Sequence, residues 1–335
     1  MENKHTIGDL YQMQSLSLDA KIRMTMARIE GWIREFGEDG VYISFSGGKD
    51  STVLMDIIRN QMGYNIPAVF IDVPTQFPEL RDFAKTWENV EILHPQISFM
   101  EVCEQYGFPL ISKEVSLKIV RIHKNPTTSK YLRYFDGSQK GKSFYDHTKY
   151  RFLLDAPFNV SHECCEIMKH KPVFEYEKRT KRKGFIGTMA QESLIRTQKW
   201  IANGCNAFNL KRPVSTPMAF WTEQDILAYI HTYNIPICSV YGDVVIDYDS
   251  MGEMDGQVIF DEFSDNIKYK TTGCKRTGCM LCGFGCHLNN DERFVQLKES
   301  HPKMYNLLDV VKNNGVTFRE AIEWTNEHGN LDIKL

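Results

Sequence analysis

The sequence predicts an α/β protein with a doubly wound, mostly parallel sheet that carries helices on both faces. Three stretches with the pattern of buried strands alternate with stretches whose apolar residues have helical spacing. This alternation is typical of right-handed crossovers between parallel strands. The chain has 335 residues, of which 42% are hydrophobic, so it can bury one large core with or without a smaller appendage.

The predicted elements follow in a regular order over the first third of the chain. Residues 18–37 have apolar side chains on one helical face and end at a glycine. After this helix we expect strands at 41–46, 67–72 and 90–95, each followed by a helix, at about 49–62, 78–89 and 98–107.

The pattern becomes less regular between about 113 and 152, where ten lysine and arginine residues lie among seven tyrosine and phenylalanine residues. We interpret this segment as a basic, aromatic insertion. A helix near 164–178, a strand at 184–189 and a helix at 220–233 are predicted after it. The expected division is an N-terminal helical segment (1–37), an α/β domain (38–245) and a C-terminal part with a cysteine-rich loop and helices (246–335).

Charge and composition limit the classes of function. The formal net charge is −3, so any site for a polyanion has to be local. No apolar run reaches about 18 residues, and the first ten residues lack the apolar stretch of a secretion signal. We therefore expect a cytoplasmic protein that does not span a membrane.

The run "VYISFSGGKDSTVL" (41–54) places two glycines between a buried strand and a helix. Glycines at such a turn allow close backbone approach to an anion, and the helix N-terminus supplies free N–H groups. Ser46 and Ser51 add hydroxyl groups, and Lys49 adds a positive charge. The spacing matches neither the Walker A loop nor the dinucleotide glycine motif.

The stretch "SFSGGKDST" instead resembles the PP-loop of the ATP pyrophosphatases, S-x-G-G-x-D-S. The resemblance implies that the loop binds the pyrophosphate part of ATP and that the chemistry takes place at the α-phosphate. It also implies a role for Asp50 in holding Mg²⁺, directly or through water. The residues expected to bind the nucleotide here are Ser44, Ser46, Gly47, Gly48, Lys49, Asp50 and Ser51.

Two further stretches resemble the phosphoadenylyl-sulfate (PAPS) reductase family of that superfamily. "VFIDVPTQFPELRDF" (69–83) is similar to V-F-I-D-T-G-x-x-F-P-E, although Val73 and Pro74 replace the family's Thr-Gly. "GTMAQESLIRTQKW" (187–200) is similar to G-x-x-x-x-E-S-x-x-R. The resemblance implies an adenine-nucleotide α-hydrolase-like fold. The additional nucleotide-site residues that it implies are Asp72, Gly187, Glu192 and Arg196.

Both sets of residues also have simple structural explanations. Asp72 could belong to the first turn before a helix, and Glu192 and Arg196, four residues apart, could form a surface ion pair. In the functional interpretation, Asp72 ends a strand at the edge where ligands of such sheets gather, and Arg196 clamps a phosphate. With Lys49 and Asp50, Arg196 completes the expected catalytic set.

Six of the nine cysteines are clustered, which in a reducing compartment indicates a metal or redox site rather than disulfides. "HECCEIMKHKPV" (162–173) resembles the tandem-cysteine motif of cluster-bearing adenylyl-sulfate reductases. That resemblance implies a [4Fe–4S] cluster on Cys164, Cys165, Cys279 and Cys282. A competing local set, Cys274, Cys279, Cys282 and Cys286, could hold zinc or a cluster, with zinc the less favoured metal.

Two departures from the family's reductases favour ATP as the substrate. The last cysteine is Cys286, so the family's C-terminal E-C-G-x-H nucleophile is not matched. Those reductases also tend to lose the loop lysine and aspartate, whereas Lys49 and Asp50 are present here. We therefore expect an adenylylating sulfurtransferase related to tRNA thiolation enzymes and DNA phosphorothioation sulfurtransferases.

The expected partners follow from that function. They are tRNA or DNA, held by the basic segments 113–152 and 178–183, and a cysteine desulfurase or another sulfur donor. Both segments could equally be solvated surface with packed aromatic side chains. Two other functions remain open: a sulfonucleotide reductase that uses an unusual thiol such as Cys286 or a partner's thiol, and a non-catalytic regulator that binds nucleotide and cluster.

Overall fold

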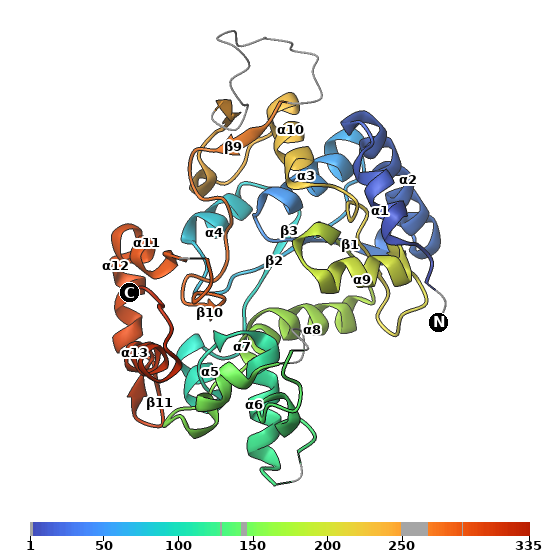
Figure 1. The fold of residues 1–335 in the computed structure, drawn as a ribbon. Coiled ribbons are helices and arrows are strands. Elements are labelled where there is room, and N and C mark those ends of the chain that lie inside the picture. The colour runs from blue at the N-terminus through green and yellow to red at the C-terminus, as the bar shows by residue number, and fades with distance from the viewer. Residues whose placement is uncertain (1–2, 128, 142–145, 249–266, 290) are drawn as a thin grey trace, which may run out of the picture. The chain divides into compact units, whose positions relative to one another are not determined.

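The computed structural model describes residues 3–127, 129–141, 146–248, 267–289 and 291–335 (Figure 1). The chain forms two compact units, each assembled from segments far apart in sequence. The sheet unit comprises Met1–Asp72, Phe77–Leu93 and Val173–Thr277. The cysteine unit comprises Val73–Gln76, His94–Pro172 and Gly278–Leu335.

The sheet unit is built on a six-stranded sheet with the strand order β3-β2-β1-β5-β7-β6. All neighbouring pairs are parallel except β6 and β7, which are antiparallel. The strand bounds are β1 Val41–Phe45, β2 Ala68–Ile71, β3 Val90–Leu93, β5 Lys183–Ile186, β6 Asn206–Ala207 and β7 Val214–Ser215. This mixed α/β architecture with a mostly parallel sheet confirms the predicted fold class.

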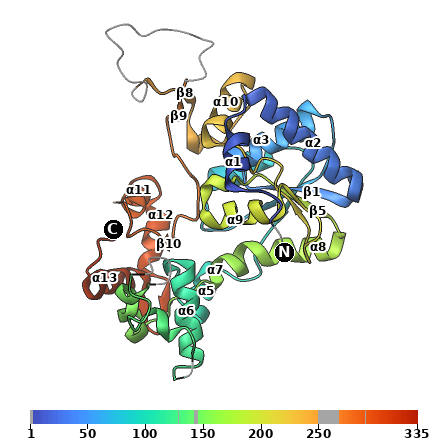
Figure 2. The ribbon, with the colours of Figure 1, turned by 45° about the vertical axis from the view of Figure 1, so that its right-hand side comes forward.

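Different helices cover the two faces of the sheet. Successive side chains of β1 point to opposite faces and show which helices these are. Val41, Ile43 and Phe45 face the main core, which also contains side chains of α2, α3, α9 and α10. Tyr42 faces the opposite side and packs against Tyr176 of α8. Figure 2 shows α8 along one side of β1 and β5, with α2 and α3 on the other. The helix bounds are α1 Ile7–Gln14, α2 Leu18–Phe36, α3 Lys49–Asp56, α4 Pro78–Lys85, α8 Lys171–Thr180, α9 Leu194–Asn203 and α10 Glu223–Tyr233.

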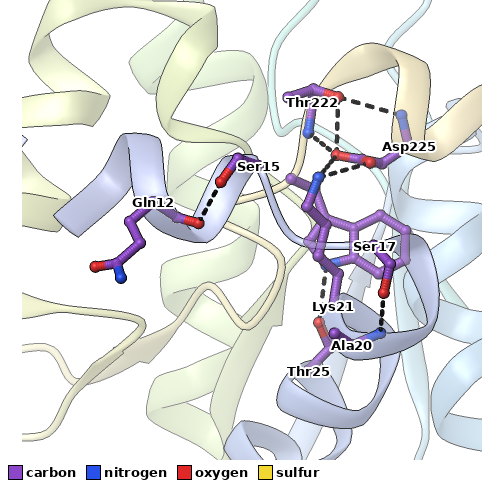
Figure 3. A network of polar contacts seen from close by, with 9 residues as sticks. Gln12, Ser15, Ser17, Ala20, Lys21, Thr25, Thr222 and Asp225 are labelled. Carbon is purple, nitrogen blue, oxygen red and sulfur yellow. Dashed lines mark hydrogen bonds and ion pairs between the residues drawn. The ribbon is translucent and has the colours of Figure 1, made fainter. Parts of the chain in front are cut away.

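A buried polar network fixes the start of α10 against α2 (Figure 3). Lys21 is 2% exposed, and its ammonium donates to both carboxylate oxygens of Asp225 at 2.7 Å. Asp225 also accepts from the backbone N–H of Thr222, whose hydroxyl in turn caps the helix. The indole N–H of Trp221 donates to Thr25 of α2 at 2.9 Å. The reciprocal bonds of Thr222 and Asp225 satisfy two backbone N–H groups at the start of α10, and the Lys21 and Trp221 contacts hold that end of the helix against α2.

The cysteine unit is mainly helical and contains short paired strands. Its strand β4 (Leu110–Ile111) pairs in parallel with β10 (Gly283–Phe284), and β11 (Lys312–Asn313) pairs with β12 (Val316–Thr317). Its helices are α5 Phe99–Tyr106, α6 Lys113–Lys124, α7 Glu163–Cys165, α11 Arg293–Ser300, α12 Pro302–Tyr305 and α13 Phe318–Gly329. A π-helical turn, Glu166–His170, joins α7 to α8.

The segment 113–152 is more regular than the sequence analysis predicts, because it begins with the twelve-residue helix α6. Val115, Ile119 and Ile122 of α6 are buried at i, i+4 and i+7 spacing, and Ser112 caps its start. The dense lysine and arginine residues between these positions conceal the pattern. Lys142, Phe144, Tyr145 and residues 249–266 lie outside the described residues.

In the sheet unit, the last paired strands are β8 (Val244–Ile246) and β9 (Tyr269–Thr271). The predicted strands and helices between 18 and 107 are confirmed, with ends that differ by a few residues. None of the helices in the described ranges is long and apolar enough to cross a membrane.

Candidate nucleotide site and cysteine cluster

The site begins at the turn between β1 and α3. Gly47 has φ +71°, a conformation that favours glycine, and a Cβ there would lie 3.1 Å from the carbonyl oxygen of Leu80. Gly48 occupies the cap position of α3 with no side-chain hydrogen bond to the first turn. Because Gly48 has no side chain that could cap the helix, the first N–H groups of α3 are suited to an anionic ligand.

The turn lies at the point of the sheet where the strand order reverses. From β1 the chain crosses to β2 on one side, whereas β5 pairs with β1 on the other side. Ligands of open α/β sheets bind outside the carboxyl ends of strands at such a point. Asp72 directly follows β2, and Gly187 directly follows β5.

A cavity of about 660 Å³ opens beside this turn within the sheet unit. Five of the residues predicted from sequence for nucleotide binding line it: Ser46, Gly48, Lys49, Asp50 and Glu192. Other walls come from the start of α10 (Thr222, Glu223 and Gln224), from Tyr241 and from the strap Lys275–Thr277. Charged groups of both signs therefore surround a space large enough for a small-molecule ligand.

Lys49 is the most enclosed cation of the cavity, at 6% exposed. Its ammonium donates to the carbonyl oxygen of Lys275 at 3.0 Å and lies 3.4 Å from Glu223 Oε1. It also lies 5.3 Å from the centre of the Tyr241 ring. These contacts hold a buried charge beside the glycine turn.

Two guanidinium groups meet at Glu192. Arg196 Nη1 donates to Glu192 Oε2, and Arg276 Nη2 donates to Glu192 Oε1 at 3.2 Å. Glu192 Oε2 also accepts from the backbone N–H of Met189 at 2.9 Å, so the carboxylate is held by its own turn. Burial lowers the pKa of Arg196, and the positive charge of Arg276 lowers it further. Glu192 and Arg276 line the cavity, and Arg196, which does not line it, holds the Glu192 carboxylate in place.

Asp50 lies among these groups. Burial raises its pKa above the ordinary range, and the negative charge of Glu223 adds to that effect, while Lys49, Arg276 and Arg196 oppose it. A carboxylate in this environment is poorly solvated, so a cation that binds it replaces missing interactions.

In the cysteine unit, the four thiols predicted to form a cluster site interact with one another. Burial raises the pKa of the Cys164 thiol, and Cys279, Cys165 and Cys282 raise it further. Burial likewise raises the pKa of Cys282, with additional contributions from Cys279 and Cys165. The tandem pair in α7 and the later C-x-x-C pair are therefore neighbours.

Lys169 from the π-helical turn lies beside the same thiols. Burial is the largest single influence and lowers the pKa of its ammonium, but Cys279, Cys165 and Cys282 together outweigh it, so the net shift is upward. The cysteine loop is fixed by backbone contacts on two sides: Met280 N–H donates to Thr75 O at 2.7 Å, and Gly285 N–H to Ile111 O at 2.8 Å. Arg293 also donates to the carbonyl oxygen of Cys282 at 2.8 Å.

Comparison with known proteins identifies the family. The phosphoadenosine phosphosulfate reductase domain matches residues 40–109 and 111–283, which is most of the chain. The chain belongs to the phosphoadenosine phosphosulfate reductase family. It is also 24% identical over 202 residues to an uncharacterized protein of Methanocaldococcus jannaschii, a match that covers 60% of this chain but only 33% of that protein.

The other residues predicted for the nucleotide site do not line the cavity: Ser44, Gly47, Ser51, Asp72, Gly187 and Arg196. The hydroxyl of Ser51 accepts from Ser46 N–H at 3.1 Å and donates to Gly48 O at 2.9 Å, so it braces the turn. A Cβ on Gly187 would lie 2.9 Å from the carbonyl oxygen of Asp50, so this glycine admits the PP-loop backbone. Ser44 lies within β1 and pairs with Val69 and Ile186 on its two neighbouring strands.

Glu223, Tyr241 and the strap Lys275–Thr277 are cavity residues that the sequence analysis does not assign to the nucleotide site. The strap lies between Cys274 and Cys279, two members of the competing metal-ligand set predicted from the sequence. Its position is set by pairing with 240–243: Gly273 N–H donates to Tyr241 O at 2.8 Å and Cys274 N–H to Val240 O at 2.9 Å. The signal in the sequence was the Lys-Arg-Thr triplet, which a metal loop does not require.

The cysteine unit of this family member has the donor set that an iron–sulfur cluster requires, because thiolates are its usual ligands. The positive charge of Lys169 suits a site of several thiolates. Thr75 supports the same interpretation: its buried hydroxyl has no hydrogen-bond partner among the described residues, and it neighbours the cysteine loop. Within the described part of the chain, no three His, Cys, Asp or Glu side chains are arranged to ligate a single metal ion.

The two remaining clustered cysteines differ from this set. Cys274 belongs to the sheet unit, where burial and the charge of Glu79 raise the pKa of its thiol. Cys286 is 1% exposed, and its thiol donates to Gly283 O at 2.8 Å. Burial raises the pKa of Cys286 to about 12.

Proposed function

We propose that this chain binds ATP with Mg²⁺ at the glycine turn, cleaves it at the α-phosphate and releases pyrophosphate. The observation that carries the proposal is the position of Lys49 and Asp50 at the start of α3, facing a cavity that Glu192 also lines. A lysine and a carboxylate beside free helix N–H groups suit a polyphosphate with its cation.

Each residue has a defined part in this reaction. Lys49 and Arg196 stabilise negative charge that develops on the phosphates as the α–β bond breaks. Asp50 would hold Mg²⁺, which supplies positive charge to the phosphates when it is bound. Glu192 orients Arg196 and is itself fixed by the backbone N–H of Met189.

The acceptor of the adenylyl group is, in this proposal, an oxygen of a nucleic acid that is then replaced by sulfur. Cys164, Cys165, Cys279 and Cys282 would hold a [4Fe–4S] cluster, which supplies the sulfur-transfer chemistry when bound. The mutual interaction of these four thiols supports this set, and Lys169 balances part of their negative charge. A cysteine desulfurase or another donor would supply the sulfur.

Substitution of the loop lysine tests the ATP reaction. Lys49→Ala removes a buried cation that we place on the phosphates, so pyrophosphate release from ATP should fall by about 10²–10³-fold. Lys268→Ala is the control, because it removes the same charge from an exposed position outside the cavity. Equal pyrophosphate release by Lys49→Ala and the wild-type protein would refute the assignment.

Two basic surfaces support a nucleic-acid acceptor. In the cysteine unit, Lys130 and Arg133 are exposed and lie over the rings of Tyr131 and Tyr134, which stack at 6.3 Å. In the sheet unit, Lys181 is exposed at the end of α8. Exposed cations beside stacked rings suit phosphate contacts and base stacking.

Combined alanine substitutions at Lys130 and Arg133, and a separate one at Lys181, test this acceptor. Binding of tRNA or of single-stranded DNA, measured by titration, should weaken and lose part of its salt dependence. Arg179→Ala is a comparison for α8, because Arg179 already pairs with Glu91 and should contribute less. Unchanged binding of both nucleic acids by every variant would remove the acceptor from the proposal.

The structure gives little support to a reductase that uses Cys286 as its nucleophile. A thiol attacks as the thiolate, and this one is buried, donates to Gly283 O and has a pKa raised to about 12. Conversion of PAPS or adenylyl sulfate to sulfite without ATP cleavage would nevertheless establish a reductase. ATP binding without pyrophosphate release, with no effect of Asp50→Ala, would establish a regulator.

A further inference from the structure

The strap Lys275–Thr277 is built against the glycine turn by contacts at each of its three residues. The Lys275 carbonyl oxygen accepts from the Lys49 ammonium at 3.0 Å, and the Thr277 hydroxyl lies 2.6 Å from the Tyr241 hydroxyl. Arg276, between them, reaches Glu192 at 3.2 Å. The backbone N–H of Cys274, just before the strap, is also bonded to Val240 O. The strap is therefore a fixed wall of the cavity.

Arg276 is more exposed than Lys49 and Arg196, the two cations that the proposed function assigns to the phosphates. Its side chain is 70% exposed, compared with 41% for Arg196 and 7% for Lys49. The Arg276 charge nevertheless acts on the buried groups, because it lowers the pKa of both Asp50 and Arg196. Arg276 and Arg196 repel each other, so an anion that enters the cavity and binds both guanidinium groups would relieve this repulsion.

Glu192 allows Arg276 to change partners. Its Oε2 is bound by Arg196 and by Met189 N–H, whereas Arg276 contacts Oε1. Glu192 therefore remains paired and fixed when Arg276 turns to another anion.

We propose that Arg276 is a second phosphate-binding arginine, which contacts the polyphosphate of ATP from the strap while Arg196 of α9 and Lys49 of α3 bind it from the other side. This proposal rests on the proposed function of the same site. It assigns to the Lys-Arg-Thr triplet of the cysteine-rich stretch a role in substrate binding that is separate from any metal. Arg276 is a better phosphate ligand than a lysine would be, because its planar fork can bind two oxygens at once.

Titration of the full-length protein with Mg-ATP tests the proposal on four forms: wild type, Arg276→Ala, Arg276→Lys and Lys268→Ala. We expect Arg276→Ala to weaken ATP binding at least tenfold and to raise the KM for pyrophosphate release by more than it lowers kcat. Arg276→Lys should recover part of the affinity, and Lys268→Ala should remain within about twofold of wild type. Because Arg276 is mostly exposed, its variants should keep the wild-type Tm.

Lys49→Ala separates this proposal from the function on which it rests. If Lys49→Ala weakens ATP binding while Arg276→Ala stays within twofold of wild type, the role of Arg276 is refuted and the ATP site stands. If Lys49→Ala also leaves ATP binding unchanged, the ATP site itself is wrong and the proposal falls with it. If Arg276→Ala and Lys268→Ala weaken ATP binding equally, the cause is the loss of positive charge anywhere on the protein, and the assignment is also refuted.

Discussion

Gly187 allows the loop after β5 to lie directly against the PP-loop that follows β1. A side-chain carbon at this position would push the two loops apart. The nearest atoms to an added Cβ are the Asp50 carbonyl oxygen and carbon, at 2.9 and 3.1 Å, and Ser51 Cα at 3.2 Å. All three belong to the backbone, which cannot rotate away as the end of a side chain can. Gly187 therefore sets the position of Asp50.

Gly187→Ala should therefore displace the PP-loop. We expect a loss of stability of about 1–3 kcal/mol, typical of overpacking, and weaker ATP binding. Gly8→Ala is the matched control, because its added Cβ would meet Thr6 Oγ1 at an ordinary 3.5 Å within α1. An unchanged Tm and an unchanged ATP affinity in Gly187→Ala would contradict this prediction, because the PP-loop would then accommodate the added carbon.

At the residue scale, the part of the site that could be predicted is the part carried by a local motif. Lys49 and Asp50 are placed by the strand–glycine–helix order alone, and both line the cavity. Arg276 and Tyr241 reach the same cavity from far along the chain, through pairing of 240–243 with 272–274. The Lys-Arg-Thr triplet marks Arg276 as a candidate binding residue, but no local pattern records the pairing that brings Arg276 and Tyr241 to the cavity.

The element most important for the cavity wall is the start of α10, which carries Glu223 beside Lys49. Its position depends on the ion pair of Lys21 in α2 with Asp225 in α10. The side chains of the pair are only 3% and 14% exposed, so removal of one partner leaves a poorly solvated charge.

Lys21→Ala should cost about 3–5 kcal/mol in the free energy of unfolding, because Asp225 then loses its partner in a buried place. Arg23→Ala is the control on the same helix. Its ion pair with Asp19 is more than 70% exposed on both sides, so we expect no measurable change. Denaturant unfolding measures both variants, and a similar effect for the two would contradict the importance of burial.

Elements were predictable where apolar periodicity is clean. The buried strands β1 and β2 and the helices α2 and α3 follow from their patterns, and so does the parallel sheet. α6 was missed because lysines and arginines fill the positions between its buried Val115, Ile119 and Ile122. The π-helical turn Glu166–His170, which carries Lys169 to the cysteines, has no simple sequence signal.

At the scale of the whole molecule, the chain builds each unit from distant segments, and sequence order does not reveal this. Residues 73–76, directly after β2, belong to the cysteine unit. There Gln76 forms an isolated antiparallel β-bridge with Cys279. A division of the sequence into consecutive ranges cannot describe units that are each made of three separate segments. The two units nevertheless separate the two chemistries that the motifs indicate, a nucleotide site and a thiol cluster.

Cysteine variants distinguish the two proposed ligand sets. Anaerobically purified wild-type protein should contain about four iron and four sulfide per chain. Cys165→Ser should lose most of the iron, because its thiol belongs to the four that interact, whereas Cys274→Ser should retain it. Cys205→Ala, a buried thiol of the sheet unit, is the control. Loss of iron in Cys274→Ser with retention in Cys165→Ser would favour the competing set, and zinc in place of iron would exclude the cluster.

The central claim is that this member of the phosphoadenosine phosphosulfate reductase family breaks ATP between the α- and β-phosphates. The most direct measurement is the identity of the products from ATP labelled at the α-phosphate, with Mg²⁺ present and with tRNA or DNA added in parallel. We predict labelled AMP or a labelled adenylyl adduct together with unlabelled pyrophosphate, and their loss in Lys49→Ala. Intact ATP under every condition, or release of ADP and phosphate, would contradict the claim.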